Sequence, residues 1–400
     1  MARRWLVVLL VSAVLTVVAA PPATAVSNTV EPSWMTNGKL YSMVQVGDVM
    51  YLAGQFKQMR ETPAGVAGAK FKVGNLGAID LTAGVGVSSF RHFVTHASAA
   101  PFVRTVAASP DGTTLYVGGR FDAIDGVPLR NLAAIDLTTN QVIPSFAPTV
   151  GGETNAVYTI LVSPDESKIY VGGAFTAVNK QTRRHSAAFA TDGSLDPDWK
   201  PLPNKNVRSL TFASDNASIF MAGAFDQVNG ASRQSIVRVD PTTGALHAWA
   251  VPPGEISSPM VCWSVVANAT RLFAGCGKGP NFVEAFRLDN GTSGSRAWKF
   301  GTVGNVQKVT LGTEGLFVGG HFGTGRLQQT VCSNKNLRGL MLMNPSTGSI
   351  DCNWIPQLEP FGNNFQGVWD IDLTSTHVWF AGNFTHVNGT NQQNVARMAR

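Results

Sequence analysis

One phrase of seven residues recurs along this chain, and it limits the possible folds more than any other feature. It joins an apolar run to two small residues and a phenylalanine, and it reads Leu-Tyr-Val-Gly-Gly-Arg-Phe over residues 115–121. Similar phrases occupy residues 50–56, 169–175, 219–225, 316–322 and 378–384, and a degenerate copy occupies residues 272–277. The phenylalanines bracket a period of about 55 residues, which is typical of β-propellers and solenoids.

Each repeat contains the same four parts. An alternating apolar run and a turn, as at residues 157–165, precede the recurrent phrase. A third apolar run and a Thr-Gly turn follow it, and a short piece with one aromatic residue ends the unit. Four short strands between Gly and Asp turns predict one propeller blade, and no window has the 3.6-residue period of a helix. The copies therefore predict an all-β, seven-bladed β-propeller with four-stranded blades.

The two ends of the chain suggest how such a ring closes. The last residues, 394–398, read as a third strand, so the last blade lacks its fourth. Residues 31–34 read Glu-Pro-Ser-Trp and resemble Asp-Pro-Asp-Trp at residues 196–199. We therefore expect Trp34 to supply the outermost strand of the last blade. A closed ring leaves no sheet edge around its circumference, whereas the alternative, an open solenoid, leaves this end-to-end match unexplained.

The glycine pair and the acidic turns have structural interpretations. A Cβ at the paired glycines would clash with a neighbouring blade, so we expect the pair to allow close approach between blades. Asp136 and Asp240 precede turns, where a carboxylate accepts backbone N–H groups. Metal binding needs several oxygens, so these single acids predict turn caps and no metal site.

The first 25 residues resemble a secretory signal peptide. Arg3 and Arg4 precede an apolar stretch at residues 5–18, and Ala-Thr-Ala at residues 23–25 resembles a cleavage site. We expect residues 26–400 to form one secreted, extracellular, monomeric domain. No later apolar stretch reaches 18 residues, so no membrane insertion is expected after cleavage. The formal charge of +6 comes without long basic tracts, which argues against a nucleic-acid partner.

The four cysteines fit an oxidising compartment. Cys262 and Cys276 lie symmetrically around a hairpin turn at residues 268–270, which would place them opposite each other on antiparallel strands. Cys332 and Cys352 would form the second disulfide. The alternative is a set of free buried thiols. No pair has the spacing of a zinc site, so neither a metal nor a cofactor is predicted.

The recurrent phrase also resembles a known family. Its extended form, Tyr-Val-Gly-Gly-x-Phe-x-x-x-x-Gly, is met at residues 116–126 and, in a related form, at residues 220–230. It resembles the delta-sixty-repeat β-propellers, which are secreted or surface proteins with no agreed function. The resemblance covers nearly all of residues 26–400, and it implies a fold and a location but no catalytic residues. The degenerate copy departs from the pattern at Cys276, where a disulfide would replace lost packing.

One position of the innermost strands repeatedly carries a long side chain. We call this set the axial ring, and it consists of Tyr41, Arg104, Tyr158, Arg208, Trp263, Gln307 and Trp369. The following position carries Ser42, Thr105, Thr159, Ser209, Ser264, Lys308 and Asp370. Flat rings and planar cations at the mouth of the propeller axis suit sugars or anions. The alternative is that the rings only pack between blades.

Loops that follow the recurrent phrase carry many basic residues and would lie on the same face as the axial ring. They contain Lys57, Arg60, Lys70, Lys72, Arg130, Lys180, Arg183, Arg184, Arg233, Lys278, Arg326 and Lys335. The acids there are Glu61, Asp122, Asp125 and Asp226. Clustered positive charge steers anionic partners, although solvated surface charge is an equal alternative.

Two classes of function follow. The first is a recognition protein that binds an extracellular polysaccharide or another anionic surface polymer. The second is a propeller hydrolase or lyase that acts on such a polymer through Asp370 or Asp372, together with Arg104 or Arg208. No nucleophile motif accompanies these carboxylates, so the sequence favours binding.

Overall fold

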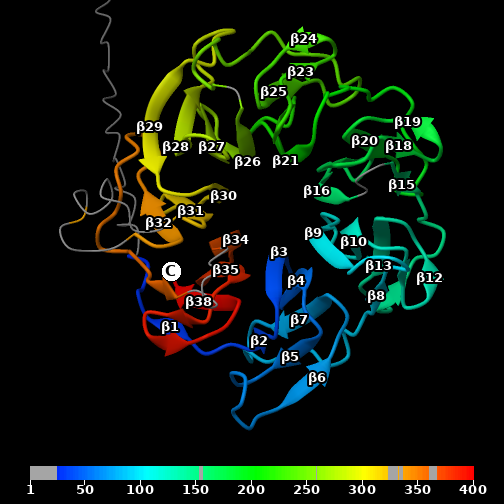
Figure 1. The fold of residues 1–400 in the computed structure, drawn as a ribbon, viewed down its shortest axis with the longest axis vertical. Coiled ribbons are helices and arrows are strands. Elements are labelled where there is room, and N and C mark those ends of the chain that lie inside the picture. The colour runs from blue at the N-terminus through cyan, green and yellow to red at the C-terminus, as the bar shows by residue number, and fades with distance from the viewer. Residues whose placement is uncertain (1–24, 153–155, 258, 323–331, 333–336, 360–366) are drawn as a thin grey trace, which may run out of the picture.

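The computed structural model describes residues 25–152, 156–257, 259–322, 332, 337–359 and 367–400. Every regular element in these ranges is a β-strand, which confirms the predicted all-β class. Figure 1 shows the sheets arranged around a central axis, with β3, β9, β16, β21, β26, β30 and β34 nearest to it.

The larger sheets each run outward from one of these innermost strands. In chain order they are β3 (Lys39–Val46), β4 (Val49–Gln55) and β7 (Leu76–Asp80); β9 (Phe102–Ala108), β10 (Thr114–Arg120), β13 (Leu132–Asp136) and β14 (Gln141–Val142); β16 (Val157–Val162), β17 (Ile169–Gly173) and β20 (Ser186–Phe189); β21 (Val207–Phe212), β22 (Ile219–Gly223) and β25 (Ile236–Val239); β26 (Val261–Ala267), β27 (Arg271–Gly277), β28 (Asn281–Arg287) and β29 (Arg296–Thr302); β30 (Val306–Leu311), β31 (Leu316–Gly320) and β32 (Leu340–Met343); and β34 (Gly367–Leu373), β35 (His377–Asn383), β38 (Val395–Ala399) and β1 (Val30–Glu31).

Loops between these strands form smaller sheets of short strands. They are β2 (Met35–Thr36), β5 (Gln58–Arg60) and β6 (Lys70–Lys72); β8 (Val94–Thr95), β11 (Ala123–Ile124) and β12 (Val127–Pro128); β15 (Val150–Gly151), β18 (Ala177–Val178) and β19 (Gln181–Thr182); β23 (Gln227–Val228) and β24 (Ala231–Ser232); and β33 (Leu358–Glu359), β36 (His386–Val387) and β37 (Thr390–Asn391).

The core consists of apolar side chains from neighbouring sheets. One cluster joins Phe273 and Val283 of the β26–β29 sheet to Val306, Val318 and Met341 of the β30–β32 sheet. The phenylalanine that ends the recurrent phrase is buried in every regular copy, at Phe56, Phe121, Phe175, Phe225, Phe322 and Phe384. Removing such rings from water at about 25 cal/mol per Å² is what holds successive sheets together.

Aromatic side chains near the outer edges link each sheet to the next. The indole N–H of Trp199 donates to the carbonyl O of Asp240 at 3.2 Å, and that of Trp249 donates to Arg287 O at 2.9 Å. Trp298 makes the same link to Pro345 O at 2.9 Å. Trp354 donates to Ser27 O at 3.0 Å, so the N-terminal segment takes the place that the next sheet occupies elsewhere.

The N-terminal segment joins the last sheet, but not through the residue that we predicted. The outermost strand is β1, where Val30 pairs with Met398 and Glu31 pairs with Arg397. Trp34 instead packs near Phe71, at 5.4 Å between ring centroids, against a core cluster that contains residues of both the first and the last sheet. The prediction for Trp34 was wrong because only two residues before Pro32 pair with β38, and the chain then crosses to the next sheet.

The paired glycines serve two different contacts. A Cβ on the first glycine, as at Gly118, would meet the Val157 side chain of the next sheet, as predicted for the pair. A Cβ on the second, as at Gly119, would overlap the carbonyl O of Phe102 in the same sheet. The prediction of a contact between sheets is therefore wrong for the second glycine. It opposes a β-bulge, where the inner strand bends towards it.

We expect Gly119→Ala to lower the free energy of unfolding by about 2 kcal/mol, because the added methyl group overpacks a backbone contact. Gly151→Ala is the matched control, since a Cβ there would meet nothing within 4 Å. Urea unfolding of both variants measures the difference. Equal stability of the two variants would contradict this explanation of the glycine.

Both predicted disulfides are present, Cys262–Cys276 and Cys332–Cys352. Cys262 directly opposes Cys276. Cys276 occupies the position that the second glycine of the pair has in other copies, for example Gly119 and Gly173. The bridge thus replaces the glycine contact in the degenerate copy. Disulfides are compatible with an oxidising compartment. Among the described residues no helix is long and apolar enough to cross a membrane.

The acidic turns have the predicted structural role. Asp136 Oδ1 accepts hydrogen bonds from the backbone N–H groups of Thr138 and Thr139, at 2.8 and 3.1 Å. Asp240 Oδ1 does the same for Thr242 and Thr243, at 2.9 and 2.7 Å. The Thr138 hydroxyl, which also donates to Asp136, and these backbone bonds hold the pKa of Asp136 below its usual value, so the carboxylates stabilise turns.

Candidate functional site

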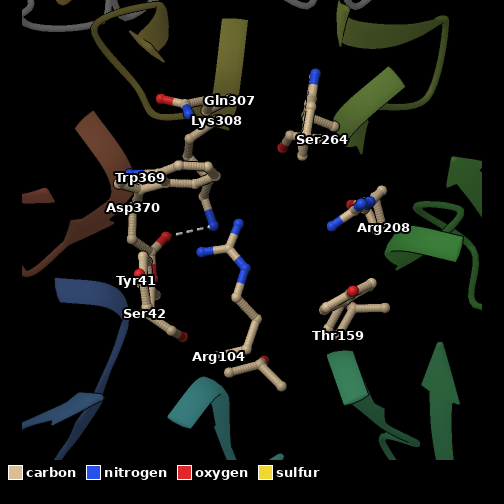
Figure 2. Close-up of a pocket in the computed structure, with 14 residues that line it drawn as sticks. Tyr41, Ser42, Arg104, Thr159, Arg208, Ser264, Gln307, Lys308, Trp369 and Asp370 are labelled. Carbon is tan, nitrogen blue, oxygen red and sulfur yellow. Dashed lines mark ion pairs between the residues drawn. The ribbon is translucent and has the colours of Figure 1, made fainter. Parts of the chain in front are cut away.

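The axial ring and the residues after it line one cavity at the centre of the molecule, which we call the axial cavity (Figure 2). Each ring residue is the unpaired residue of a β-bulge in its innermost strand. Tyr41, for example, is skipped between the pairs Leu40–Gly54 and Ser42–Ala53. The same irregularity skips the other six. Because bulges redirect side chains, they account for the convergence of all seven.

Two arginines of the ring lie against aromatic faces. The guanidinium carbon of Arg104 is 4.8 Å from the ring centroid of Tyr41 and 4.1 Å from that of Trp369. That of Arg208 is 4.1 Å from Tyr158 and 4.7 Å from Trp263. Cation–π contacts of this kind hold a guanidinium plane in place, which prepares it for a planar or tetrahedral anion.

Burial makes these cations costly. Burial, with repulsion from Arg208, lowers the pKa of Arg104 to about 10. Burial also lowers the pKa of Arg208. Arg104 remains cationic at neutral pH, because about 10 is still well above 7, and an arginine side chain is in general protonated in proteins. An anion between them would relieve the penalty of two like charges in one cavity.

Several N–H groups around the axial cavity are buried without a hydrogen-bond partner. Within the described residues, these are Arg104 Nη1, Arg208 Nε, Trp263 Nε1 and Trp369 Nε1. Each unpaired buried donor costs about 1–3 kcal/mol. These nitrogens belong to side chains that line the cavity, but each is itself shielded from the space inside it, so the two guanidinium charges, and not these donors, indicate a site for an anion.

A lysine and an aspartate of the lining neutralise each other. Lys308 Nζ lies 2.7 Å from Asp370 Oδ1, and Asp370 Oδ2 accepts the backbone N–H of Met43 at 2.6 Å. Asp370 thereby raises the pKa of Lys308 even though burial opposes it. Asp370 also favours the charged form of Arg104, but the lining holds three cations, Arg104, Arg208 and Lys308, against this single acid, so the excess charge of the cavity is positive.

Asp372, the other predicted carboxylate, is not among the residues that line the axial cavity. It accepts the backbone N–H groups of Gln45 at 3.1 Å and Leu373 at 2.9 Å. Burial and the nearby Asp370 raise the pKa of Asp372. Its charged form is thus disfavoured, and its hydrogen bonds join β34 to β3.

The position after the axial ring has a structural role that the sequence analysis missed. The hydroxyl oxygens of Ser42, Ser209 and Ser264 accept backbone N–H groups of the next innermost strand, at Val106, Val265 and Val309. Asp370 accepts Met43 N–H in the same way, from the last innermost strand to the first. The signal was present in the sequence as small hydroxyl residues that recur at one position.

The size of the axial cavity limits what enters it. Its volume is about 100 Å³, enough for a few water molecules or one small ion. Pockets that enclose drug-sized ligands measure about 300–1,000 Å³. A sugar ring therefore does not fit inside in this conformation, whereas a carboxylate, sulfate or phosphate group does.

The basic loops are confirmed only in part. Because β10 runs antiparallel to β9, the loop after Gly119 leaves the sheet at the end where β9 begins, beside the axial ring. Exposed cations of such loops are Lys57, Lys70, Lys72, Arg130, Lys180, Arg184 and Lys278. Arg60 and Arg233 are half-buried, and Arg183 is buried, so these three contribute less. Arg326 and Lys335 lie outside the described residues.

Comparisons with known proteins concern the fold. A family model described as a β-propeller domain of unknown function, DUF5122, matches residues 167–198. No curated protein matches the chain. Similar solved structures include the WD40 β-propeller domain of Doa1, at 12% identity and a TM-score of 0.54, over 92% of this chain and 97% of that one. The computationally designed protein Ika8 is similar at 10% identity and a TM-score of 0.52, over 92% and 98%. Together with the all-β sheets around one axis, these similarities show that the chain has the β-propeller fold.

Proposed function

We propose that the protein is a secreted, monomeric recognition propeller of seven four-stranded blades, whose axial cavity binds an anionic group. Its ring closes where β1 joins β38 and Asp370 bonds to Met43. The signal-like residues 1–25, the two disulfides and the delta-sixty-repeat resemblance support an extracellular location. The domain in this proposal spans residues 26–400.

The observation that carries this function is the pair of aromatic-stacked arginines that line one small cavity with an excess of positive charge. An oxyanion would accept hydrogen bonds from the guanidinium groups and compensate the two charges, and charge-assisted hydrogen bonds are the strong ones. The ligand is a carboxylate, sulfate or phosphate group. It is either a free ion or a terminal or side group of an extracellular polysaccharide or other surface polymer, with the exposed basic loops steering its approach.

A hydrolase or lyase is the weaker candidate. Catalysis by Asp370 would need a carboxylate free to move a proton, but Lys308 and Met43 N–H already engage both of its oxygens. Asp372 is likewise engaged by two backbone N–H groups away from the cavity lining. These contacts favour binding over chemistry at this site.

The test is isothermal titration with sulfate, phosphate, acetate, glucuronate, a sulfated polysaccharide and a polyuronate. We expect at least one free anion to bind. We also expect Arg104→Met or Arg208→Met to weaken its binding about 30-fold, equivalent to about 2 kcal/mol. Tighter binding of a polymer than of its free anion would identify the polymer as the source. Arg271→Met, which removes an arginine at the start of β27 and outside the cavity lining, is the control. Failure of every probe to bind, or binding that is unaffected in both variants, would contradict the axial site.

A further inference from the structure

Two grooves lie between successive sheets at the opposite end of the molecule from the axial cavity. Innermost strand β9 begins beside the axial ring at Arg104 and ends before the turn that contains Asp111, so that turn marks the far end. The first groove has a volume of about 250 Å³ and lies between the β9–β14 sheet and the β16–β20 sheet. The second has a volume of about 300 Å³ and lies between the β16–β20 and β21–β25 sheets.

The two grooves are built from the same positions of the repeat. The turn carboxylate and the buried tyrosine of the first groove, Asp111 and Tyr116, correspond to Asp165 and Tyr170 of the second. Across each groove lies a polar residue of left-handed backbone, Glu166 at φ 58° or Asn216 at φ 57°. Because both grooves repeat one arrangement, they are not a single accidental gap in the packing.

The corresponding space between the next two sheets is filled by an arginine. Arg238 opposes Phe220 across the strand pair, and its guanidinium carbon lies 5.5 Å from the Phe220 ring centroid. Its Nε donates to Ser218 Oγ at 2.6 Å. At the same register, Ala134 opposes Tyr116 and Ala188 opposes Tyr170. Ala134 lines the first groove and leaves the space that the longer side chain occupies in the β21–β25 sheet. Ala188 has the same register in the next sheet, although it is not itself part of the lining of the second groove.

The first groove contains a tyrosine hydroxyl without a partner. Tyr116 is only 3% exposed and lines the groove, and its hydroxyl makes no hydrogen bond within the described part of the chain. The corresponding hydroxyl of Tyr170 donates to Pro241 O at 2.6 Å. Residue 191 lines the groove at the position of Pro241. Because Tyr116 lines the groove, this hydroxyl is available to a ligand with hydrogen-bonding groups.

The other lining groups define the ligand chemistry. Asp111 Oδ2 accepts only from Thr113 Oγ1, at 2.9 Å, and so retains acceptor capacity. Phe146, Ile143 and Val162 form an apolar wall. In the first groove two carboxylates, Asp111 and Glu166, with no cation in the lining, exclude an anion. In the second groove the lining cation, Lys168, is already paired with Asp196 at 2.7 Å. Acceptors beside an apolar wall, in a volume near the lower limit of about 300 Å³ for ligand pockets, suit one sugar ring.

We propose that these two grooves are a second class of site, in which each binds one neutral, hydroxyl-rich sugar residue. This inference does not depend on the anion at the axial cavity. Two equivalent sites on one face allow a polysaccharide to occupy both, and that raises its apparent affinity above the affinity of either site.

The experiment is saturation-transfer NMR and titration with glucose, galactose, mannose and N-acetylglucosamine, followed by oligosaccharides of whichever sugar binds. We expect at least one sugar to bind weakly. Ala134→Arg combined with Ala188→Arg, which copies the filling by Arg238, should abolish the signal. Tyr116→Phe removes one hydroxyl without changing the shape and should weaken binding severalfold. Arg104→Met, at the axial cavity, should leave sugar binding unchanged.

Three outcomes would overturn the proposal: no sugar of the panel binds, binding persists in the folded double variant, or Arg104→Met abolishes it. If the double variant does not fold, unchanged affinity in both Tyr116→Phe and Asp111→Asn overturns it instead. Loss of anion binding alone refutes the axial site and leaves the grooves intact, so the two proposals fail separately.

Discussion

A chain that begins at Met35 is expected to lose about 5 kcal/mol or more of its free energy of unfolding compared with a chain that begins at Val26. The longer chain retains the pairing of β1 with β38 and the hydrogen bond from the Trp354 indole to Ser27 O. It also retains the bonds of buried Gln392 Nε2 to Ser33 and the ion pair of His377 with Glu31, at 2.8 Å. Each hydrogen bond contributes about 1 kcal/mol, and each orphaned buried donor costs a further 1–3 kcal/mol.

The effect should spread through the whole domain, because β38 becomes an exposed edge and the last sheet loses part of its core. Thermal unfolding by circular dichroism and calorimetry measures both the shift and its cooperativity. The chain that begins at Val26 is the control, and it should unfold in one transition. If both chains melt together within experimental error, the N-terminal segment is not what holds the last sheet, and the proposed ring closure fails.

The sequence predicted most of the architecture, because a repeated phrase turns one structural unit into several observations. The all-β class, the cysteine pairs and the buried phenylalanines such as Phe121 follow from that pattern. The error at Trp34 has a physical origin. A two-residue strand is too short to leave an alternating pattern, so the aromatic beside it was mistaken for the strand itself.

The sequence predicted which residues line the candidate site, but it did not predict how those residues interact. Alignment of the innermost strands placed Arg104 and Trp369 at one level, but an alternating pattern cannot reveal that both residues belong to bulges. Nor does sequence spacing show which carboxylate is paired, since Lys308 and Asp370 come from different strands. The grooves beside Tyr116 and Tyr170 were missed because the signal is an alanine, a residue that carries no chemistry of its own.

The ion pair of Lys308 with Asp370 provides a test of how the ring is held together. Lys308 and Asp370 occupy the position that follows the axial ring, where the other innermost strands have serine or threonine. The hydroxyls of Ser42, Ser209 and Ser264 each accept a backbone N–H from the neighbouring innermost strand. The two charges therefore substitute for two hydroxyls, and each depends on the other. Removing one partner of a buried pair typically costs about 3–5 kcal/mol, whereas removing both together is often nearly neutral.

We accordingly expect Lys308→Ser to lower the free energy of unfolding by about 3 kcal/mol at neutral pH, because it removes the cation paired with Asp370 and leaves the repulsion between Asp370 and Asp372 less compensated. Burial and Asp370 already raise the pKa of Asp372 above 3.8 in the folded state. A carboxyl group with a raised folded pKa destabilises the fold above that pKa, and this loss disappears as the pH falls towards 3.8. The deficit of Lys308→Ser relative to the parent should therefore shrink on acidification.

The double variant Lys308→Ser with Asp370→Ser should restore most of the stability, because the second serine can accept Met43 N–H as Ser42 accepts Val106 N–H. Asp370→Ser alone should also have a lower free energy of unfolding, because it leaves Lys308 without its acidic partner in a cavity that contains two arginines. Urea unfolding of the four proteins at neutral and acidic pH gives the coupling energy, which we expect to be about 2 kcal/mol or more. Additive losses at neutral pH would mean that the two charges act independently, and that the hydroxyl-like role of Asp370 is wrong.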